Sequence, residues 1–394
     1  MRISEEKINE LLAGNVNEIV DKEHLKRVLH SGKKLRIKLG IDPTGPRIHL
    51  GRAVALWKLK EFQDLGHQIV LIVGDFTGLV GDASDKKSGR SMLTEEQVKK
   101  NMADYPKQIG KILDVKKVEF RQNSEWLSRL TMKDIIRLSS LFTVHQMIDR
   151  RNFKERFEKG QQIGLHEFLY PLLQGYDSVA THADVELGGT DQLFNLKAGR
   201  KIQEFYGQEP QDILLLEMLP GLDGQKMSTT SGNIINIGDE PKDMYGKIMS
   251  MKDELIAEYF LRCTNVPDEK ISEIKKGLEN KTFDPLREKS YLASEIVKLY
   301  HGDVSAKTAA EHFRKTFQEK ESPDDAQKIK VKKGEELADV LIISGIVSSK
   351  SEFRRLVREK AIEADGAVLN NSHYVIVKTS VIKVGKRRFL KIII

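Results

Sequence analysis

Short apolar runs alternate with amphipathic segments over residues 35–230, and this alternation restricts the fold more strongly than any other feature of the chain. Runs rich in β-branched residues are typical of strands, whereas apolar residues three and four apart are typical of helices. The strand-like runs occupy 35–41, 68–76, 118–122 and 212–219, and helical periodicity marks 51–65 and 94–113. Because strands that alternate with helices build βαβ units, the sequence predicts an open, mainly parallel α/β sheet.

The next part of the chain has a helical pattern. Between residues 241 and 318, apolar residues recur at spacings of three and four, with few strand signals. This pattern is typical of amphipathic helices that pack on one another. We therefore expect a parallel-sheet domain over 1–235, which includes a connecting segment, and an α-helical domain over 236–320.

The last part of the chain is predicted to be a linker and a small domain. Residues 321–332 are polar and contain Pro323, which favours a linker. Two short helical patterns then precede strand-like runs at 373–378 and 380–394. We therefore expect a small α+β domain over 333–394.

Composition places limits on the class of protein. A chain of 394 residues with 39% hydrophobic residues can form two or three domains with a sizeable core. Its longest apolar runs are far shorter than the roughly 20 residues of a membrane span, and its amino terminus is charged rather than signal-like. A single cysteine, Cys263, excludes an intramolecular disulfide and a multi-cysteine zinc site. We expect a cytoplasmic protein with no membrane partner and no protein-bound metal.

The positive charge of the chain is concentrated in its tail. Residues 331–394 contain 13 Lys or Arg and 7 Asp or Glu, a net charge of +6 out of +7 for the whole chain. A basic module on a nearly neutral body indicates an anionic partner held by that module. RNA or DNA is favoured over a membrane, because no lipidation signal accompanies the charge.

Three stretches have the composition of phosphate-binding loops. In 40–62, a loop rich in Asp, Pro, Thr and Gly leads into a helix that begins near His49, and a helix start offers unpaired amides to an anion. Residues 74–90 are glycine-rich and then basic, and 221–233 place one lysine among hydroxyls and glycines. Each stretch alone is more typical of a solvated turn, and the two commonest nucleotide fingerprints are absent.

Two short motifs within these stretches resemble those of a known family. HLGR at 49–52 and KMSTT at 226–230 resemble the HIGH and KMSKS signatures of class I aminoacyl-tRNA synthetases. The chain is similar to the bacterial tyrosyl-tRNA synthetases of this class along its whole length. Further matching stretches are GIDPTGPRIHLG, GDASDKKSGR, YPLLQGYD and ELGGTDQLFN, and residues 336–366 resemble an S4-type RNA-binding domain.

The resemblance implies a fold and a reaction. It implies a Rossmann-like catalytic domain, a helical anticodon-side domain and an S4-type domain at the carboxyl end. The partners that it implies are tRNA(Tyr), tyrosine, ATP and a second copy of the chain in a homodimer. In this family, tyrosine attacks the α-phosphate of ATP, and the tyrosyl group then passes to the terminal ribose of the tRNA. ATP enters as a substrate with Mg²⁺. Since the substrates supply the nucleophiles, the protein contributes positioning and charge stabilisation.

The family pattern also implies roles for individual residues. On the ATP side, Thr44 and His49 match contacts to the γ-phosphate, and mobile cations that close over pyrophosphate match Lys86, Arg90 and Lys226. The other implied ATP-binding residues are Asp42, Gly51, Gly189, Asp191, Met227 and Ser228. On the tyrosine side, Asp82, Tyr170 and Gln174 match the residues around the α-ammonium, Asp177 matches the one that binds the phenol hydroxyl, and Lys38, Thr77 and Gln192 line the pocket.

The chain departs from the family pattern at three positions. Lys38 stands where many members have a tyrosine that binds the phenol hydroxyl, Arg52 replaces the second histidine of HIGH, and Thr229 replaces the second lysine of KMSKS. The ammonium of Lys38 could pair with Asp177 or turn away from it. We expect it to turn away toward solvent, because a four-carbon stem can reach water from the edge of a pocket.

The cationic residues of the tail share one helical face. Lys350, Arg354 and Arg358 are four apart, with Arg355 adjacent. Such a face suits the phosphates of A-form RNA, so these four residues are predicted to bind RNA. Two rivals remain open beside a tyrosine–tRNA ligase, namely a tryptophan-specific relative and a catalytically silent RNA-binding regulator derived from a synthetase.

Overall fold

The computed structural model describes residues 3–82, 93–227, 231–318, 327–385 and 388–394. The chain divides into two compact units, Met1–Gly302 and Asp303–Ile394. No helix in these described stretches has both the length and the apolar character that crossing a membrane requires.

A six-stranded sheet forms the centre of the first unit, in the order β1-β6-β5-β2-β3-β4. Strands β2 to β6 run parallel, and β1 pairs antiparallel with β6 at one edge. The strands are β1 Val16–Val20, β2 Arg36–Ile41, β3 Gln68–Val73, β4 Val118–Gln122, β5 Val185–Gly189 and β6 Asp212–Leu216. The predicted parallel α/β sheet is confirmed, and its four predicted runs form β2, β3, β4 and β6.

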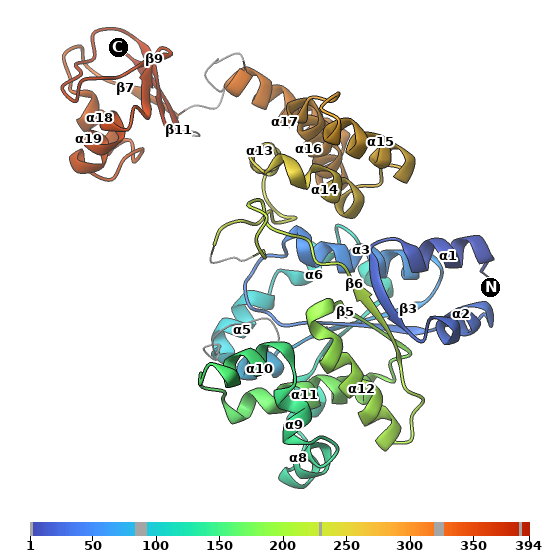
Figure 1. The fold of residues 1–394 in the computed structure, drawn as a ribbon. Coiled ribbons are helices and arrows are strands. Elements are labelled where there is room, and N and C mark those ends of the chain that lie inside the picture. Colours follow the sequence, from blue (N-terminus) through green and yellow to red (C-terminus); the bar gives the residue numbers. More distant parts are fainter. Residues whose placement is uncertain (1–2, 83–92, 228–230, 319–326, 386–387) are drawn as a thin grey trace. The chain divides into compact units, whose positions relative to one another are not determined.

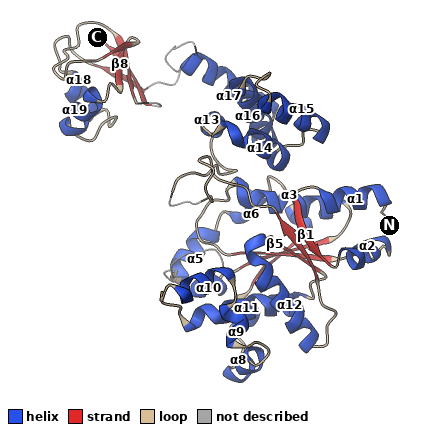
Figure 2. Cartoon of the chain, in the orientation of Figure 1, coloured by secondary structure: helices blue, strands red, loops and turns tan. Residues whose placement is uncertain are grey.

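Helices cover both faces of this sheet (Figure 1). Helices α1, α3 and α6 lie on one face, and α11 and α12 lie on the other, as Figure 2 also shows. Strand β3 is accordingly buried at five of its six positions, which is the pattern of a parallel strand covered on both sides. The helices are α1 Glu5–Ala13, α2 Lys22–His30, α3 Leu50–Asp64, α4 Thr77–Val80, α5 Glu95–Met102, α6 Tyr105–Ile109, α7 Ser124–Leu127, α8 Met132–Ser139, α9 Val144–Ile148, α10 Arg151–Glu158, α11 Leu165–Thr181 and α12 Leu193–Phe205, with short 3₁₀ turns at η1 Val115–Lys117 and η2 Thr190–Gln192.

One of the two predicted helical segments forms a single helix, and the other does not. The segment 51–65 corresponds to α3, whereas 94–113 is divided into α5 and α6. Pro106 lies in the first turn of α6, where its missing N–H and fixed φ are tolerated. Proline therefore starts a new helix instead of continuing the previous one.

The helical pattern between 241 and 318 is confirmed. Its elements are α13 Pro241–Met249, η3 Asp253–Leu255, α14 Ile256–Cys263, α15 Asp268–Glu279, α16 Pro285–His301, α17 Asp303–Phe313 and the π-helical turn η4 Arg314–Gln318. Helix α16 is tied to α3, because the indole Nε1 of Trp57 donates to the hydroxyl of Tyr300 at 3.0 Å. The two compact units divide between α16 and α17, and the domain bounds at 235 and 320 stay predictions.

The carboxyl-terminal unit also contains a small α+β fold. A five-stranded sheet has the order β7-β11-β10-β8-β9, and its side chains form a core with two helices. The elements are β7 Gln327–Lys330, α18 Leu337–Ile343, α19 Lys350–Arg358, β8 Ile362–Ala364, β9 Ala367–Val368, β10 Ser380–Val384 and β11 Arg388–Ile393. Leu341, Phe353 and Ile382 are each at most 1% exposed in this core.

Two expectations for this region need correction. The segment 327–330 is strand β7, paired parallel with β11, so the predicted linker over 321–332 does not hold there. The predicted strand at 373–378 forms only an isolated bridge between Val375 and Glu336. Its backbone bonds the loop and helix start at 334–337 instead, with Leu337 N–H donating to the carbonyl of Tyr374 at 2.9 Å. Apolar alternation alone could not distinguish this extended segment from a sheet strand.

Candidate functional site

The carboxyl ends of neighbouring parallel strands bring the predicted site residues together. Asp42 follows β2, Thr77 lies shortly after β3, and Asn123 directly follows β4. Gly189 ends β5, and Asp191 comes two residues later. Ligands of open parallel α/β sheets bind at this edge, so the sheet places these groups where a substrate can reach several of them at once.

The carboxylate of Asp42 is the centre of one hydrogen-bonded cluster. It accepts from the hydroxyl of Thr77 at 2.8 Å and from the hydroxyl of Tyr170 at 2.9 Å. Burial raises the pKa of Asp42 to about 6, although the hydrogen bond from Thr77 lowers it. A Cβ at Gly74 would lie 2.1 Å from Asp42 Oδ1, so only glycine at this position allows the cluster to form.

A second cluster surrounds Asp177 on α11. The indole Nε1 of Trp126 donates to Asp177 Oδ1 at 2.8 Å, and the amide of Asn123 donates to Oδ2 at 3.2 Å. Asp177 is 3% exposed, and burial raises its pKa to about 7 while the positive charge of Lys38 lowers it. A carboxylate can accept about four hydrogen bonds, so Asp177 retains acceptor capacity for a further donor such as a phenol hydroxyl.

The sequence interpretation missed Asn123 and Trp126. The amide of Asn123 also donates to the hydroxyl of Thr77 at 3.0 Å, so this residue connects the two clusters. A signal was present in the sequence, because Asn123 directly follows a predicted parallel strand and the ligand edge lies at such strand ends. Trp126, three residues later, carried no comparable signal.

Lys38 does not reach solvent, contrary to the expectation for this residue. Its side chain is fully buried, and its ammonium lies 2.9 Å from Glu186 Oε1, with both residues at most 1% exposed. The ammonium also donates to Ser178 Oγ at 2.8 Å and to the carbonyl oxygen of Gln174 at 3.1 Å. An ammonium has three donors, and all three are used without Asp177. The sequence interpretation was right that Lys38 turns away from Asp177 and wrong about its destination.

A chain of side-chain amides extends from Glu186 toward Asp82. Gln174 Nε2 donates to Glu186 Oε1 at 3.3 Å, and Gln174 Oε1 accepts from the amide of Asn195 at 3.0 Å. Asn195 also donates to Gln192 Oε1 at 3.0 Å, and Gln192 Nε2 donates to Asp82 Oδ2 at 2.8 Å. Three predicted tyrosine-binding residues, Gln174, Gln192 and Asp82, therefore belong to one network, and Asn195 is a member that the sequence interpretation missed.

The HLGR segment is tied to the segment that follows the KMSTT motif. The N–H of Leu50 donates to the carbonyl of Ile235 at 2.9 Å, and the N–H of Ile237 donates to the carbonyl of Ile48 at 2.9 Å. His49 is the N-cap of α3. These bonds hold the HLGR segment beside residues 235–237, which lie far from it in the sequence.

The imidazole of His49 is partly buried, with an inaccessible Nδ1, and is neutral at physiological pH. Burial lowers its pKa to about 3, and the positive charge of Arg52 lowers it further. Its Nδ1 has no hydrogen-bond partner among the described residues. A Cβ at Gly51 would lie 2.9 Å from Met227 Sδ and 3.1 Å from His49 Nδ1, so the structure places these three predicted residues in mutual proximity.

Arg52 supports the loop that precedes α3. Its guanidinium donates to Thr44 Oγ1 at 2.8 Å, to the carbonyl oxygen of Asp42 at 3.2 Å and to the hydroxyl of Tyr105 at 3.1 Å. The hydroxyl of Tyr105 in turn donates to the carbonyl of Gly45 at 2.8 Å. Arg52, a departure from the family pattern, therefore fixes the hydroxyl of Thr44, which is predicted to contact the γ-phosphate.

The predicted cations divide into those that the structure describes and those it does not. The ammonium of Lys226 lies 3.2 Å from Asp191 Oδ2, which joins two predicted ATP-binding residues. Lys86, Arg90 and Ser228 lie outside the described residues, as does the departure at Thr229. Among the residues that are described, no group of three or more His, Cys, Asp or Glu is arranged to hold a metal ion.

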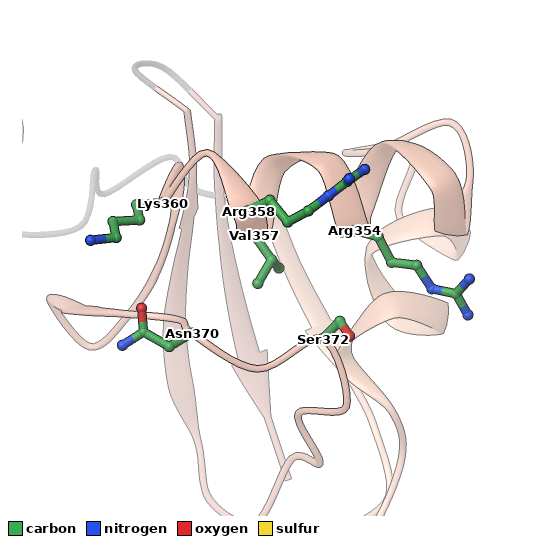
Figure 3. A pocket seen from close by; sticks show the side chains of 6 residues that line it. All are labelled: Arg354, Val357, Arg358, Lys360, Asn370 and Ser372. Carbon is green, nitrogen blue, oxygen red and sulfur yellow. The ribbon is translucent and has the colours of Figure 1, made fainter.

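The predicted RNA-binding residues all lie on α19 and are exposed. Lys350 pairs with Asp339 at 2.7 Å, and Arg355 pairs with Glu359 at 3.1 Å. Arg354 and Arg358 instead line a pocket of about 450 Å³ together with Val357, Lys360, Asn370 and Ser372. Figure 3 shows that this pocket lies between α19 and the loop that carries Asn370 and Ser372. The structure thus adds three polar residues to the predicted cationic face.

Comparison with known proteins identifies the family of the chain. The model of the family "tRNA synthetases class I (W and Y)" matches residues 30–318. The tyrosine–tRNA ligase of Thermotoga maritima is 47% identical over 98% of this chain and 97% of its own length. The tyrosine–tRNA ligase of Dehalococcoides mccartyi strain CBDB1 is 43% identical over the whole of both chains.

Solved structures share the fold of the larger part of the chain. The tyrosyl-tRNA synthetase of Archaeoglobus fulgidus, solved with L-tyrosine, covers 77% of this chain and 99% of its own, with a TM-score of 0.62 and 24% identity. A truncated mitochondrial tyrosyl-tRNA synthetase of Aspergillus nidulans covers 79% of this chain and 93% of its own, with a TM-score of 0.63 and 23% identity. With relatives above 40% identity along its whole length, the chain belongs to the tyrosine–tRNA ligases, within the class I aminoacyl-tRNA synthetases for tryptophan and tyrosine.

Proposed function

We propose that this site joins tyrosine to ATP as tyrosyl-adenylate, with release of pyrophosphate, and then transfers the tyrosyl group to the 3′-terminal ribose of tRNA(Tyr). The buried carboxylate of Asp177 is the observation that carries the choice of tyrosine. It accepts hydrogen bonds from two fixed donors and has acceptor capacity left for a phenol hydroxyl. Phenylalanine has no donor for such a group, so the geometry favours tyrosine over phenylalanine, and the similarity to tyrosine–tRNA ligases at 43% and 47% identity favours tyrosine over tryptophan.

In this proposal, the cluster around Asp42 and the amide network bind the amino group of the substrate. Tyr170, Gln174 and Asp82 surround the α-ammonium, and Thr77 and Gln192 hold them in place. Each of these side chains already has a hydrogen-bonded partner that fixes its orientation. Fixed donors and acceptors lose little entropy when the substrate binds, which favours an oriented attack on ATP.

ATP is proposed to bind at the HLGR segment and the loop before it. Thr44 and His49 contact the γ-phosphate and stabilise the charge that develops when the α-phosphate becomes five-coordinate. A partly buried, neutral His49 whose Nδ1 lacks a partner among the described residues suits this role, because one ring nitrogen can donate to phosphate. Gly51 and Met227 border the adenine, and Asp191 binds the ribose. Lys226 leaves Asp191 for the phosphates when ATP arrives.

The remaining proposed ATP contacts lie outside the HLGR segment. Lys86, Arg90 and Ser228 complete the charge around pyrophosphate, and Gly189 allows close approach of the nucleotide. Mg²⁺ enters with the phosphates of ATP as part of the substrate.

The experiment that tests this function is amino-acid-dependent exchange between ATP and pyrophosphate. Tyrosine, phenylalanine and tryptophan are assayed in parallel, and only tyrosine should support rapid exchange. Faster exchange with tryptophan would favour the tryptophan-specific alternative. No exchange with any amino acid, together with retained tRNA binding, would favour a catalytically silent RNA-binding regulator.

We further propose that the carboxyl-terminal α+β fold is an S4-type module that binds the tRNA. Arg354, Arg358 and Lys360 border one pocket, where they can meet successive phosphates of an RNA backbone. The double substitution Arg354→Glu and Arg358→Glu should severely reduce tRNA charging and leave pyrophosphate exchange unchanged. Lys22→Glu with Arg27→Glu on α2 is the matched control, because it reverses two exposed charges outside this module.

A homodimer is the proposed assembly. Large apolar side chains are exposed on consecutive helices of the first unit, namely Met132 (74%), Ile136 (61%), Val144 (71%), Phe157 (61%) and Leu165 (82%). Exposed apolar groups in such number are typical of protein interfaces. Leu165→Asp should convert the protein to a monomer in sedimentation measurements, whereas Val304→Asp, at a similarly exposed position on α17, should not. We place the protein in the cytoplasm, because a single cysteine fits a reducing compartment.

A further inference from the structure

The buried pair of Lys38 and Glu186 has no role in the reaction described above. The two residues are register partners on the adjacent parallel strands β2 and β5, so their side chains leave the same face of the sheet side by side. Their charged groups are 2.9 Å apart and at most 1% exposed. A buried ion pair is weak evidence for stability, because desolvation opposes the attraction between the charges. The pair is therefore expected to have a role other than stabilising the fold.

The contacts of Glu186 identify the group on which the pair acts. Its Oε1 accepts from Lys38 and from Gln174 Nε2, the latter at 3.3 Å. Its Oε2 accepts from Ser178 Oγ at 3.2 Å and from the amide of Gln211. Glu186 thus receives hydrogen bonds from four side chains, and only Gln174 among them has a proposed contact with the substrate.

The carboxylate of Glu186 determines which end of the Gln174 amide faces it. An ionised carboxylate only accepts hydrogen bonds, so it must face the NH₂ end of the amide. The carbonyl oxygen of the amide then points the other way, toward Asn195 and the amide network that leads to Asp82. An oxygen in this orientation can accept from an ammonium, whereas an NH₂ group there would repel one.

We propose that Lys38 and Glu186 form a positioning pair that orients the amide of Gln174 to recognise the α-ammonium of tyrosine. Lys38 donates to Glu186 Oε1 and holds this carboxylate beside Gln174, to which it presents an acceptor. Glu186 in turn retains the ammonium of Lys38 beside β5, so that it does not bind the substrate. The inference rests on the proposed role of Gln174 at the ammonium.

The test compares two ligands that differ only in the ammonium. Tyrosine and 3-(4-hydroxyphenyl)propionate, its analogue without the amino group, are measured by equilibrium competition at the same site. The ratio of their dissociation constants reports recognition of the ammonium and is insensitive to a general loosening of the pocket. We expect Glu186→Gln to reduce this ratio about tenfold, since a neutral amide can also donate to Gln174 and let it rotate. Lys38→Met should reduce it similarly, because Glu186 then loses the donor that holds its carboxylate beside Gln174.

Three controls separate positioning from folding. Glu119→Gln removes a cross-strand ion pair with Arg36 at 2.9 Å, on the same sheet but with no contact to Gln174, and should leave the ratio unchanged. The double substitution Lys38→Met with Glu186→Gln leaves no buried charge unpaired, so it provides a folded protein if a single substitution does not. It should still show the reduced ratio. Gln174→Ala reports the direct effect of the amide.

The outcomes distinguish this inference from the proposed function. An unchanged ratio in both Glu186→Gln and the double variant, beside a reduced ratio in Gln174→Ala, would overturn the positioning pair and leave the function intact. An unchanged ratio in Gln174→Ala would remove Gln174 from the ammonium site and the inference with it. Absence of tyrosine-dependent exchange in the unaltered protein would instead refute the proposed function itself.

Discussion

Discrimination between tyrosine and phenylalanine should depend on pH through one carboxyl group. Burial raises the pKa of Asp177 to about 7, and the phenol hydroxyl of tyrosine should donate to its ionised form. Phenylalanine has no hydroxyl, so its binding gains nothing from the ionisation of Asp177. The ratio of kcat/KM for tyrosine to that for phenylalanine should therefore rise with pH.

The magnitude follows from the ionised fraction of Asp177. With a pKa of about 7, about a tenth of the molecules carry the carboxylate at pH 6 and about nine tenths at pH 8. The ratio should then increase nearly tenfold over this range, which corresponds to about 1.4 kcal/mol. The phenol itself, with a pKa of about 10, does not titrate in this window. Asp42, whose pKa burial raises to about 6, acts on both amino acids alike and cancels from the ratio.

Pyrophosphate exchange with each amino acid, measured from pH 6 to pH 8, provides this ratio for the free enzyme. Asp177→Asn is the control, because an amide does not titrate, and its ratio should be low and constant with pH. A ratio that stays constant with pH in the unaltered enzyme would show that Asp177 is ionised throughout or does not contact the hydroxyl. A rising ratio in Asp177→Asn would assign the effect to another group.

Three further predictions concern the ATP half of the site, its backbone and the carboxyl-terminal module. His49→Ala and Thr44→Ala should each slow adenylate formation by about 3 to 4 kcal/mol of activation free energy, with little change in tyrosine affinity, in pre-steady-state measurements; a weakened tyrosine affinity with unchanged activation would reverse the assignment. Gly74→Ala should impair tyrosine activation severely, because its Cβ would lie 2.1 Å from Asp42 Oδ1, and normal exchange by this variant would contradict the geometry. Deletion of 327–394 should preserve exchange but severely reduce tRNA charging, and full charging by the shortened protein would exclude the module from tRNA binding.

The parts of the fold that could be predicted are those in which local pattern and burial agree. Strand β3 is continuously apolar and buried on both faces, so its composition alone indicated a central parallel strand. Strand β5 ends in two glycines, and β7 is polar and largely exposed, so neither has the composition of a strand. Such strands form because neighbouring strands offer backbone partners, and that information lies elsewhere in the chain.

The site residues also divide into those that could be predicted from the sequence and those that could not. Those within motifs, such as His49 and Asp191, could be named from sequence because the motif prescribes the residue type. Asn123, Trp126 and Asn195 contact the predicted residues through single hydrogen bonds made across the sheet edge. Trp126 carries no local signal of its contact, and the position of Asn123 after a predicted strand does not identify its partners, since these depend on which strands become neighbours.

Two of the departures from the family pattern have a common physical character. Lys38 and Arg52 each introduce a cation beside a predicted ligand-binding residue, and both direct their donors to the protein itself. A cation whose donors are already bonded contributes little direct binding to a substrate, but it fixes the groups that it holds. Lys38 holds Glu186 and Arg52 holds Thr44, which places rigid supports behind the tyrosine and ATP halves of the site. Both cations should therefore act through the residues that they orient, so that their substitution alters recognition and rate without removing a contact to substrate.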